Sequence, residues 1–191
     1  MSRIDVLGVG FDDLTRENAI DLCKRLIDEH RGAYMVTPNP EIVMAAWENA
    51  ELHDAICNAD LVIPDGIGVV KAARIIGTPL KERLPGIEIG EAILEYAAQT
   101  GKSVFLLGAK PGVADAAKEK MQETYPGLNV CGTNDGYFKD DDPVIEKINA
   151  AQPDFLMVCL GAPKQELWMA QNAERLDVGL MAGLGGSLDG F

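Results

Sequence analysis

Short apolar runs alternate with amphipathic helical patterns along the whole chain, and this alternation limits the possible folds more than any other feature. The apolar runs predict strands over 4–9, 33–37, 61–63, 103–107, 128–132, 155–160 and 178–182. Helical spacing and capping residues predict helices over 16–29, from 40 past 47, and over 67–76, 87–100, 113–125, 144–151 and 165–175. We therefore predict an α/β fold, a Rossmann-like, mostly parallel sheet with helices on both faces.

The composition is that of one folded domain with a strongly acidic charge. The chain has 191 residues and shows no linker or repeat, so residues 1–191 are predicted to form a single domain. Its 30 acidic and 17 basic residues give a formal charge of −13. Phosphate contacts need clustered lysines and arginines, so this charge argues against a nucleic-acid partner. It also argues against a basic face that binds a membrane.

The cysteines and histidines give no support for a metal site. The two histidines, His30 and His53, lie far apart in the sequence. No C-x-x-C spacing occurs among the four cysteines, which we interpret as buried thiols: Cys23, Cys57, Cys131 and Cys159.

The chain shows no leader or membrane segment. Its first ten residues contain no long apolar stretch, and no apolar run approaches about 18 residues. We therefore expect no signal peptide and no membrane span, and a cytoplasmic location is the simplest expectation.

Polar residues follow the predicted strands at the edge of a parallel sheet where ligands bind. The first strand is expected to bring four residues to this edge, Gly8, Gly10, Asp12 and Asp13. After the second strand, two prolines restrict the backbone around Thr37 and Asn39 and would hold both side chains with little loss of entropy. A rigid helix cap explains Thr37 and Asn39 equally well, and the sequence leaves both interpretations open.

Asp65 lies between a buried strand and the start of a helix. Burial would raise the pKa of its carboxyl group, whereas N–H groups at the helix start would lower that pKa. In either case the carboxylate could accept a proton from a hydroxyl group in a transition state. An N-cap is the alternative, because aspartate is common at that position.

The segment 108–112 (GAKPG) joins a predicted strand to a predicted helix. Its N–H groups and the side chain of Lys110 could hold a phosphate group. The segment matches neither G-x-G-x-x-G nor a Walker loop, and many glycine-rich loops bind no ligand.

Asp140, Asp141 and Asp142 contain the D-x-D spacing with which many sugar transferases bind a divalent metal. They follow no apolar strand and precede Pro143. We therefore interpret them as an exposed acidic helix start.

Three adjacent polar residues, Lys164, Gln165 and Glu166, follow the most apolar predicted strand. A capping turn needs only one of them, so this segment is a candidate for a site. The alternative is a solvated first helical turn, with Trp168 in the core.

Four segments together resemble the WecG/TagA/CpsF glycosyltransferase family. They are TPNPEIV at 37–43, ADLVIPDGIGVV at 59–70, G-x-P-x-Q-E-x-W at 161–168 and G-x-G-G-S-L-D at 183–189. The resemblance extends in order over essentially the whole chain and is greatest to the TagA branch of the family.

The resemblance implies a reaction of wall teichoic acid linkage-unit synthesis. N-acetylmannosamine would move from UDP-N-acetylmannosamine to undecaprenyl-diphosphate-linked N-acetylglucosamine in a β-1,4 linkage, at the inner face of the cell membrane. An inverting transfer is a single displacement that needs one base, for which Asp65 suffices. The family's known members lack a metal-binding D-x-D, so the resemblance implies neither a metal nor a cofactor.

The resemblance also implies roles for further residues. Thr37 and Asn39 would line the pocket that contains Asp65, Arg83 matches a family arginine that could hold a phosphate group, and Gln165 falls in a pocket-lining motif. Four weaker candidates are expected to bind the nucleotide: Gly108, Lys110, Gly161 and Gly185.

Two departures from the family pattern affect these expectations. Glu88 stands where the family often has aspartate, two residues after Gly86. Family members also continue with a basic C-terminal segment thought to close the active site and contact the membrane. We expect that residues 1–191 end before this segment, and that the lost arginines weaken binding of an anionic lipid diphosphate. The family further suggests a homo-oligomer.

Two other classes of function remain as alternatives. A Rossmann-type NAD-dependent oxidoreductase would need G-x-G-x-x-G after the first strand and an acidic residue farther on, and the sequence has neither. A nucleotide-sugar-binding subunit without turnover would use the same pocket residues.

Overall fold

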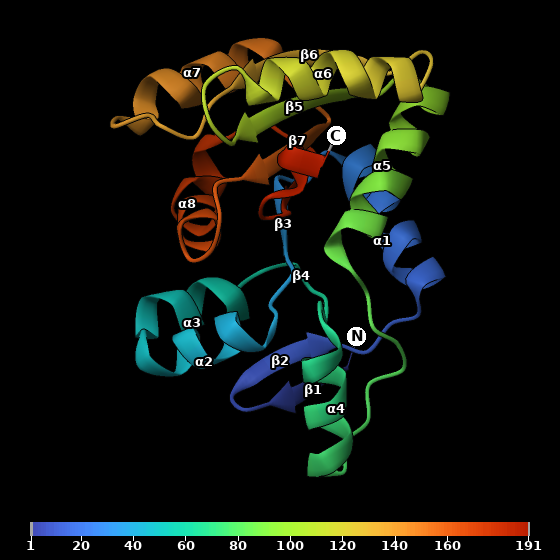
Figure 1. The fold of residues 1–191 in the computed structure, drawn as a ribbon, viewed down its shortest axis with the longest axis vertical. Coiled ribbons are helices and arrows are strands. Elements are labelled where there is room, and N and C mark those ends of the chain that lie inside the picture. The colour runs from blue at the N-terminus through green and yellow to red at the C-terminus, as the bar shows by residue number, and fades with distance from the viewer. Residues whose placement is uncertain (1, 191) are drawn as a thin grey trace.

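The structure, a computed structural model, describes residues 2–190 and is built on a six-stranded sheet in the order β4-β3-β8-β7-β5-β6 (Figure 1). Every neighbouring pair in this sheet is parallel. Its strands are β3 (Ala33–Val36), β4 (Leu61–Val62), β5 (Ser103–Gly108), β6 (Asn129–Asn134), β7 (Phe155–Cys159) and β8 (Leu180–Gly183). The predicted α/β fold with a mostly parallel sheet is confirmed.

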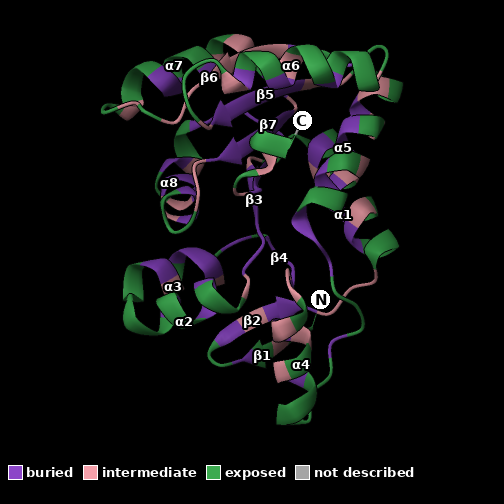
Figure 2. Ribbon diagram, in the orientation of Figure 1, coloured by how far each residue is buried: buried purple, intermediate pink, exposed green. Residues whose placement is uncertain are grey.

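Helices cover both faces of the sheet, as predicted. One face packs against α2 (Pro40–Glu48), α3 (Ala50–Cys57), α7 (Asp141–Ala151) and α8 (Lys164–Asn172). The other packs against α1 (Arg16–Glu29), α5 (Gly86–Thr100) and α6 (Val113–Thr124). Figure 2 shows the buried strands between these layers. The remaining helices are α4 (Ile67–Ile76) and two short 3-10 helices, Ala173–Arg175 and Ser187–Gly190.

Local capping chemistry starts several helices at the predicted residues. The hydroxyl of Thr15 accepts a hydrogen bond from the N–H of Asn18, and Oδ1 of Asn39 accepts one from the N–H of Ile42. Asn49 caps a further helix, α3, which the sequence analysis did not separate from α2. Helix α7 instead begins at Asp141, three residues before the predicted start at 144, and its cap is Asp140 and not Asp142. Other predicted ends differ from the structure by a few residues, which is ordinary for helix and strand ends.

The prediction that residues 4–9 form a strand of the main sheet is wrong. They belong to an antiparallel hairpin of β1 (Arg3–Val6) and β2 (Val9–Asp12). Leu7 and Gly8 both have positive φ, which is the geometry of a tight two-residue hairpin turn. The hairpin lies beside α4, below the sheet in Figure 1. Gly8, Gly10, Asp12 and Asp13 therefore follow no strand of the parallel sheet.

The cysteines are only partly as predicted. Cys23 and Cys159 are buried, whereas Cys57 and Cys131 are half-buried, and all four are free thiols. Within residues 2–190, no helix is long and apolar enough to cross a membrane.

Candidate functional site

Two connected clefts open at the carboxyl ends of the central strands. The first, which we call the Asp65 cleft, has a volume of about 540 Å³. Its polar wall includes Thr37, Asn39, Asp65, Arg83, Gln165 and Ser187. The cleft therefore brings together five residues that the sequence analysis proposed from four separate segments. In an α/β sheet, ligands bind at this edge.

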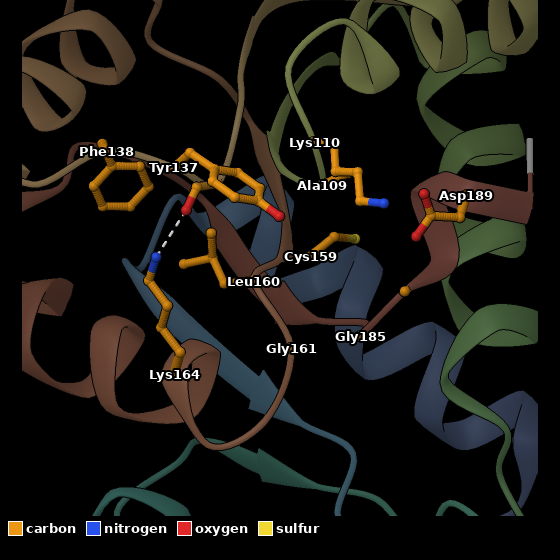
Figure 3. Close-up of a pocket in the computed structure, with 12 residues that line it drawn as sticks. Ala109, Lys110, Tyr137, Phe138, Cys159, Leu160, Gly161, Lys164, Gly185 and Asp189 are labelled. Carbon is orange, nitrogen blue, oxygen red and sulfur yellow. Dashed lines mark hydrogen bonds between the residues drawn. The ribbon is translucent and has the colours of Figure 1, made fainter.

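The second cleft, which we call the Lys110 cleft, has a volume of about 800 Å³. Lys110, Tyr137, Lys164 and Asp189 lie around it, as Figure 3 shows. The ammonium of Lys164 donates a hydrogen bond to the carbonyl of Gly136 at 2.8 Å and lies 4.6 Å from the centre of the Phe138 ring. These contacts hold Lys164 at the rim.

The two clefts share one wall. Gly161, Gly185 and Gly186 line both of them. Gly161 follows β7 and the other two follow β8, so the shared wall stands at the middle of the sheet. The two clefts are therefore neighbours along this edge of the sheet.

Asp65 is a half-buried carboxylate at the start of α5 rather than a cap of α4. No side chain caps α4, whereas the N–H of Gly86 donates to Oδ2 of Asp65 at 3.4 Å. The N-cap interpretation of Asp65 is therefore wrong. Burial raises the pKa of Asp65, although the Gly86 N–H and the charge of Arg83 oppose this effect. A carboxylate with a raised pKa is a stronger proton acceptor.

Thr37 and Asn39 combine a structural role with a place in the cleft. The Thr37 hydroxyl donates to the carbonyl of Gly183 at 2.9 Å and so ties β3 to β8. Asn39 caps α2 through its oxygen and also lines the Asp65 cleft. Gly86 packs closely on Thr37, since an added Cβ would lie 2.9 Å from Cγ2 of Thr37.

Gln165 and Glu166 are buried, so the solvated-turn interpretation is wrong for both. Gln165 is 2% exposed and Glu166 0%. Oε1 of Gln165 accepts the N–H of Gly185 at 3.0 Å, and Nε2 of Gln165 donates to Oε1 of Glu166 at 2.9 Å. Trp168 lies in the core as expected, with 4% exposure.

The four nucleotide candidates differ in their surroundings. Lys110, Gly161 and Gly185 line the Lys110 cleft. The N–H of Gly185 is already bonded to Gln165, so it is not a free donor for a phosphate. Gly108 lines neither cleft, and packing explains it: an added Cβ would lie 2.1 Å from the carbonyl oxygen of Cys159.

The three consecutive aspartates start α7, as the sequence predicts. Asp140 accepts the N–H of Asp142 at 3.1 Å and caps the helix. Asp141 accepts a hydrogen bond from the Asn172 side chain, and Asp142 forms an ion pair with Arg175.

Several cleft residues were not among the predicted site residues. Ser187 and Leu184 line the Asp65 cleft, and Asp189 lines the Lys110 cleft. All three belong to the segment after β8, whose G-x-G-G-S-L-D pattern was the available signal.

Comparison with known proteins gives the same assignment over nearly the whole chain. A sequence profile of the glycosyl transferase WecG/TagA/CpsF family matches residues 4–191. The chain is 38% identical over 165 residues to the N-acetylglucosaminyldiphosphoundecaprenol N-acetyl-beta-D-mannosaminyltransferase of Bacillus spizizenii, covering 86% of this chain and 64% of that protein. It is 34% identical over 192 residues to the protein of the same name from Staphylococcus aureus, covering 100% of this chain and 76% of that protein. The chain thus spans only part of the length of both relatives. It belongs to the WecG/TagA/CpsF family of glycosyl transferases.

Proposed function

We propose that the chain is an inverting, metal-independent glycosyltransferase of wall teichoic acid linkage-unit synthesis. It moves N-acetylmannosamine from UDP-N-acetylmannosamine to undecaprenyl-diphosphate-linked N-acetylglucosamine, in a β-1,4 linkage. Family membership and the names of both relatives support the sugar and the acceptor. The observation that carries the proposal is a half-buried carboxylate, Asp65, beside Arg83 and Gln165 in one cleft.

Asp65 is the proposed general base. The acceptor hydroxyl attacks the anomeric carbon from the face opposite the diphosphate, and its proton passes to the Asp65 carboxylate. The bond from the anomeric carbon to the acceptor oxygen forms while the bond to UDP breaks, so the configuration inverts. The electron pair of the broken bond leaves on the diphosphate.

Positive side chains in both clefts fit this leaving group. Arg83 lines the Asp65 cleft and Lys110 the second cleft, on the two sides of the shared glycine wall. A guanidinium can bind a phosphate through two hydrogen bonds, and an ammonium binds it as a point charge. We propose that the nucleotide occupies the Lys110 cleft, against Lys110, Gly161 and Gly185, while the sugar enters the Asp65 cleft near Thr37, Asn39 and Gln165.

We propose that the reaction takes place at the cytoplasmic face of the membrane, where the protein would act peripherally on a lipid-linked acceptor. A homo-oligomer remains a prediction from the family resemblance. The net charge of −13 disfavours contact with anionic lipid.

The test is the Asp65→Asn substitution in a transfer assay with UDP-N-acetylmannosamine and a short-chain lipid acceptor. Loss of the base should lower turnover by about 10²-fold or more. Asp21→Asn on the exposed face of α1 is the matched control and should keep full activity. Near-normal turnover of Asp65→Asn would remove Asp65 from this role. Binding of the UDP-sugar without transfer by the unsubstituted protein would instead favour a binding subunit.

The same variant has an expected stability. Because burial raises the pKa of Asp65, its ionised form opposes folding at neutral pH. Asp65→Asn should therefore keep or raise the Tm at pH 7, and any gain should vanish below the unfolded pKa of about 3.8, where the carboxyl group is protonated in both states. If the Tm of Asp65→Asn were lower at pH 7, misfolding would explain the lost turnover instead.

A further inference from the structure

Glu166 is a fully buried carboxyl group that the proposed mechanism does not use. It is 0% exposed, and its Oε2 has no hydrogen-bond partner among the described residues. Burial raises the pKa of Glu166. An unpaired buried carboxyl oxygen costs folding free energy, so packing alone does not account for it.

Among residues 2–190, the one side chain that bonds the Glu166 carboxyl is the amide of Gln165, at 2.9 Å. A glutamine amide can turn by 180° and exchange its oxygen for its nitrogen, so neighbouring groups decide its orientation. Here the N–H of Gly185 requires an acceptor on one side, 3.0 Å away, and Glu166 offers an acceptor on the other. In the turned amide, Nε2 would face the Gly185 N–H and Oε1 would face the Glu166 oxygen, so neither hydrogen bond could form. Oε1 of Glu166 stays an acceptor whether the group is ionised or protonated on Oε2.

The fixed orientation has two consequences for the clefts. Nε2 of Gln165 carries two hydrogens, and Glu166 takes one, which leaves the other N–H for an oxygen in the Asp65 cleft that Gln165 lines. Oε1 of Gln165 holds Gly185, which belongs to the wall between the clefts.

We propose that Glu166 is a positioning residue, which orients the Gln165 amide so that an N–H group faces the sugar-binding side and the oxygen anchors the Gly185 wall. The inference rests on the proposed function only for the identity of the ligand oxygen, a hydroxyl or acetamido oxygen of the donor sugar. The orientation of the amide is independent of that function.

The Glu166→Met substitution keeps a side chain of similar length and removes the acceptor. It also removes a buried unpaired oxygen, so the Tm should stay equal or rise. Exchange of the Gly185 backbone amide with solvent should accelerate about 10-fold, and the KM for the donor should rise about 10-fold, as for one lost hydrogen bond, with a smaller change in kcat. Glu166→Gln can present an oxygen to Gln165 and should restore both values. Glu174→Met, at an exposed glutamate, is the control.

The proposal would be overturned if, in Glu166→Met, the Gly185 backbone amide exchanged with solvent at the wild-type rate or the KM for the donor were unchanged. If that variant does not fold, the unsubstituted protein still decides, because one of the two Gln165 side-chain N–H protons should exchange more slowly than the other in NMR spectra. Equal, fast exchange of both would overturn the proposal. If the unsubstituted protein transfers no sugar, the proposed function fails, while the exchange measurements still test the role of Glu166.

Discussion

At the scale of single residues, a half-buried carboxyl group, Asp65, and a fully buried one, Glu166, differ in what surrounds them. Asp65 receives the N–H of Gly86, lies near the charge of Arg83 and opens onto a cleft. Among the described side chains, Glu166 bonds that of Gln165 alone, and it does not line the cleft. Burial raises the pKa of both groups. Access to the cleft therefore favours Asp65 as the proposed base, whereas Glu166 is proposed to act through its neighbour Gln165.

Removing the charge of Arg83 should change the pH dependence of transfer. Arg83 lowers the pKa of Asp65, so Arg83→Ala should raise that pKa further. The base must be ionised to act, so the acidic limb of the kcat/KM profile should move to higher pH, and the rate at pH 6 should fall more than the rate at pH 8. Loss of a charge-assisted phosphate contact should also lower donor affinity by about 10-fold or more.

The pH–rate profile is the measurement for this substitution. Arg74→Ala, at an exposed arginine near the end of α4, is the control and should keep the wild-type profile. An acidic limb that does not move in Arg83→Ala would contradict the electrostatic link between Arg83 and Asp65.

Residue-level prediction from sequence succeeds where the cause is local. The caps at Thr15 and Asn39 need only a side chain and an N–H three residues away, and both are confirmed. The partner of Asp65 is the N–H of Gly86, which is distant in sequence, and local capping rules therefore assign Asp65 wrongly. The burial of Glu166 contradicts its residue type, so no local pattern could predict it.

At the scale of elements, two glycines between the end of β5 and the start of α6 have different requirements. Gly108 has φ of +133° and no room for a Cβ beside the Cys159 carbonyl, whereas Gly112 has φ of +86° and open space. Gly112→Ala should cost about 1–2 kcal/mol from the backbone conformation alone. Gly108→Ala should cost more, because the contact between β5 and β7 must also open.

Urea unfolding of the two variants measures this difference under matched conditions. Equal free energies of unfolding would contradict the packing explanation of Gly108. A loss of nucleotide affinity in Gly108→Ala without any loss of stability would instead favour a direct role in nucleotide binding.

Asp12 ties the hairpin to the edge of the main sheet. It is 3% exposed, accepts the N–H of Val62 in β4 at 2.8 Å and pairs with Arg3 at 3.3 Å. Asp12→Ala would leave a buried N–H and a guanidinium without this partner, and should cost about 1–3 kcal/mol of stability. Urea unfolding is the measurement, and Asp21→Ala at an exposed site is the control. A change below about 0.5 kcal/mol, typical of surface substitutions, would contradict the role of Asp12.

The hairpin is also the element that sequence reasoning placed wrongly. Residues 4–9 read as one apolar strand, and only Leu7 and Gly8, both with positive φ, break it into two. Two-residue hairpin turns usually contain Asn-Gly or Asp-Gly, and here a leucine stands in the first position. The turn therefore carries no usual sequence signal. Buried strands such as β7 were easier to predict, because an uninterrupted short apolar run is typical of a parallel strand that is buried on both faces.

At the scale of the whole molecule, the parallel sheet gathers the site from segments far apart in sequence. Thr37 follows β3, Asp65 follows β4, and Gly185 follows β8, yet all three line the Asp65 cleft. The general rule for α/β sheets predicts this convergence. The rule does not predict that the site divides into two clefts, because that division depends on the path of the backbone after β7 and β8.

A chelator should leave transfer unchanged if the proposed reaction needs no divalent metal. The aspartates with D-x-D spacing are engaged at the start of α7, where Asp140 caps the helix and Asp142 pairs with Arg175. The proposed diphosphate contacts are Arg83 and Lys110 instead. The measurement is the transfer rate with and without EDTA, with a metal-dependent glycosyltransferase as the assay control. Inhibition that added Mg²⁺ or Mn²⁺ reverses would return Asp140 and Asp142 as metal ligands.

The bond from Asp12 to β4 also limits how copies of the chain can associate. A strand from another molecule extends a sheet by pairing with free backbone groups along its outer strand. On the β4 side, the Val62 N–H is already taken by a carboxylate, and the short strand has only two residues to pair. A strand added at this border would therefore find few free backbone groups to pair with. The opposite border of the sheet, β6, is six residues long and, within the described part of the chain, has no such bond from the hairpin.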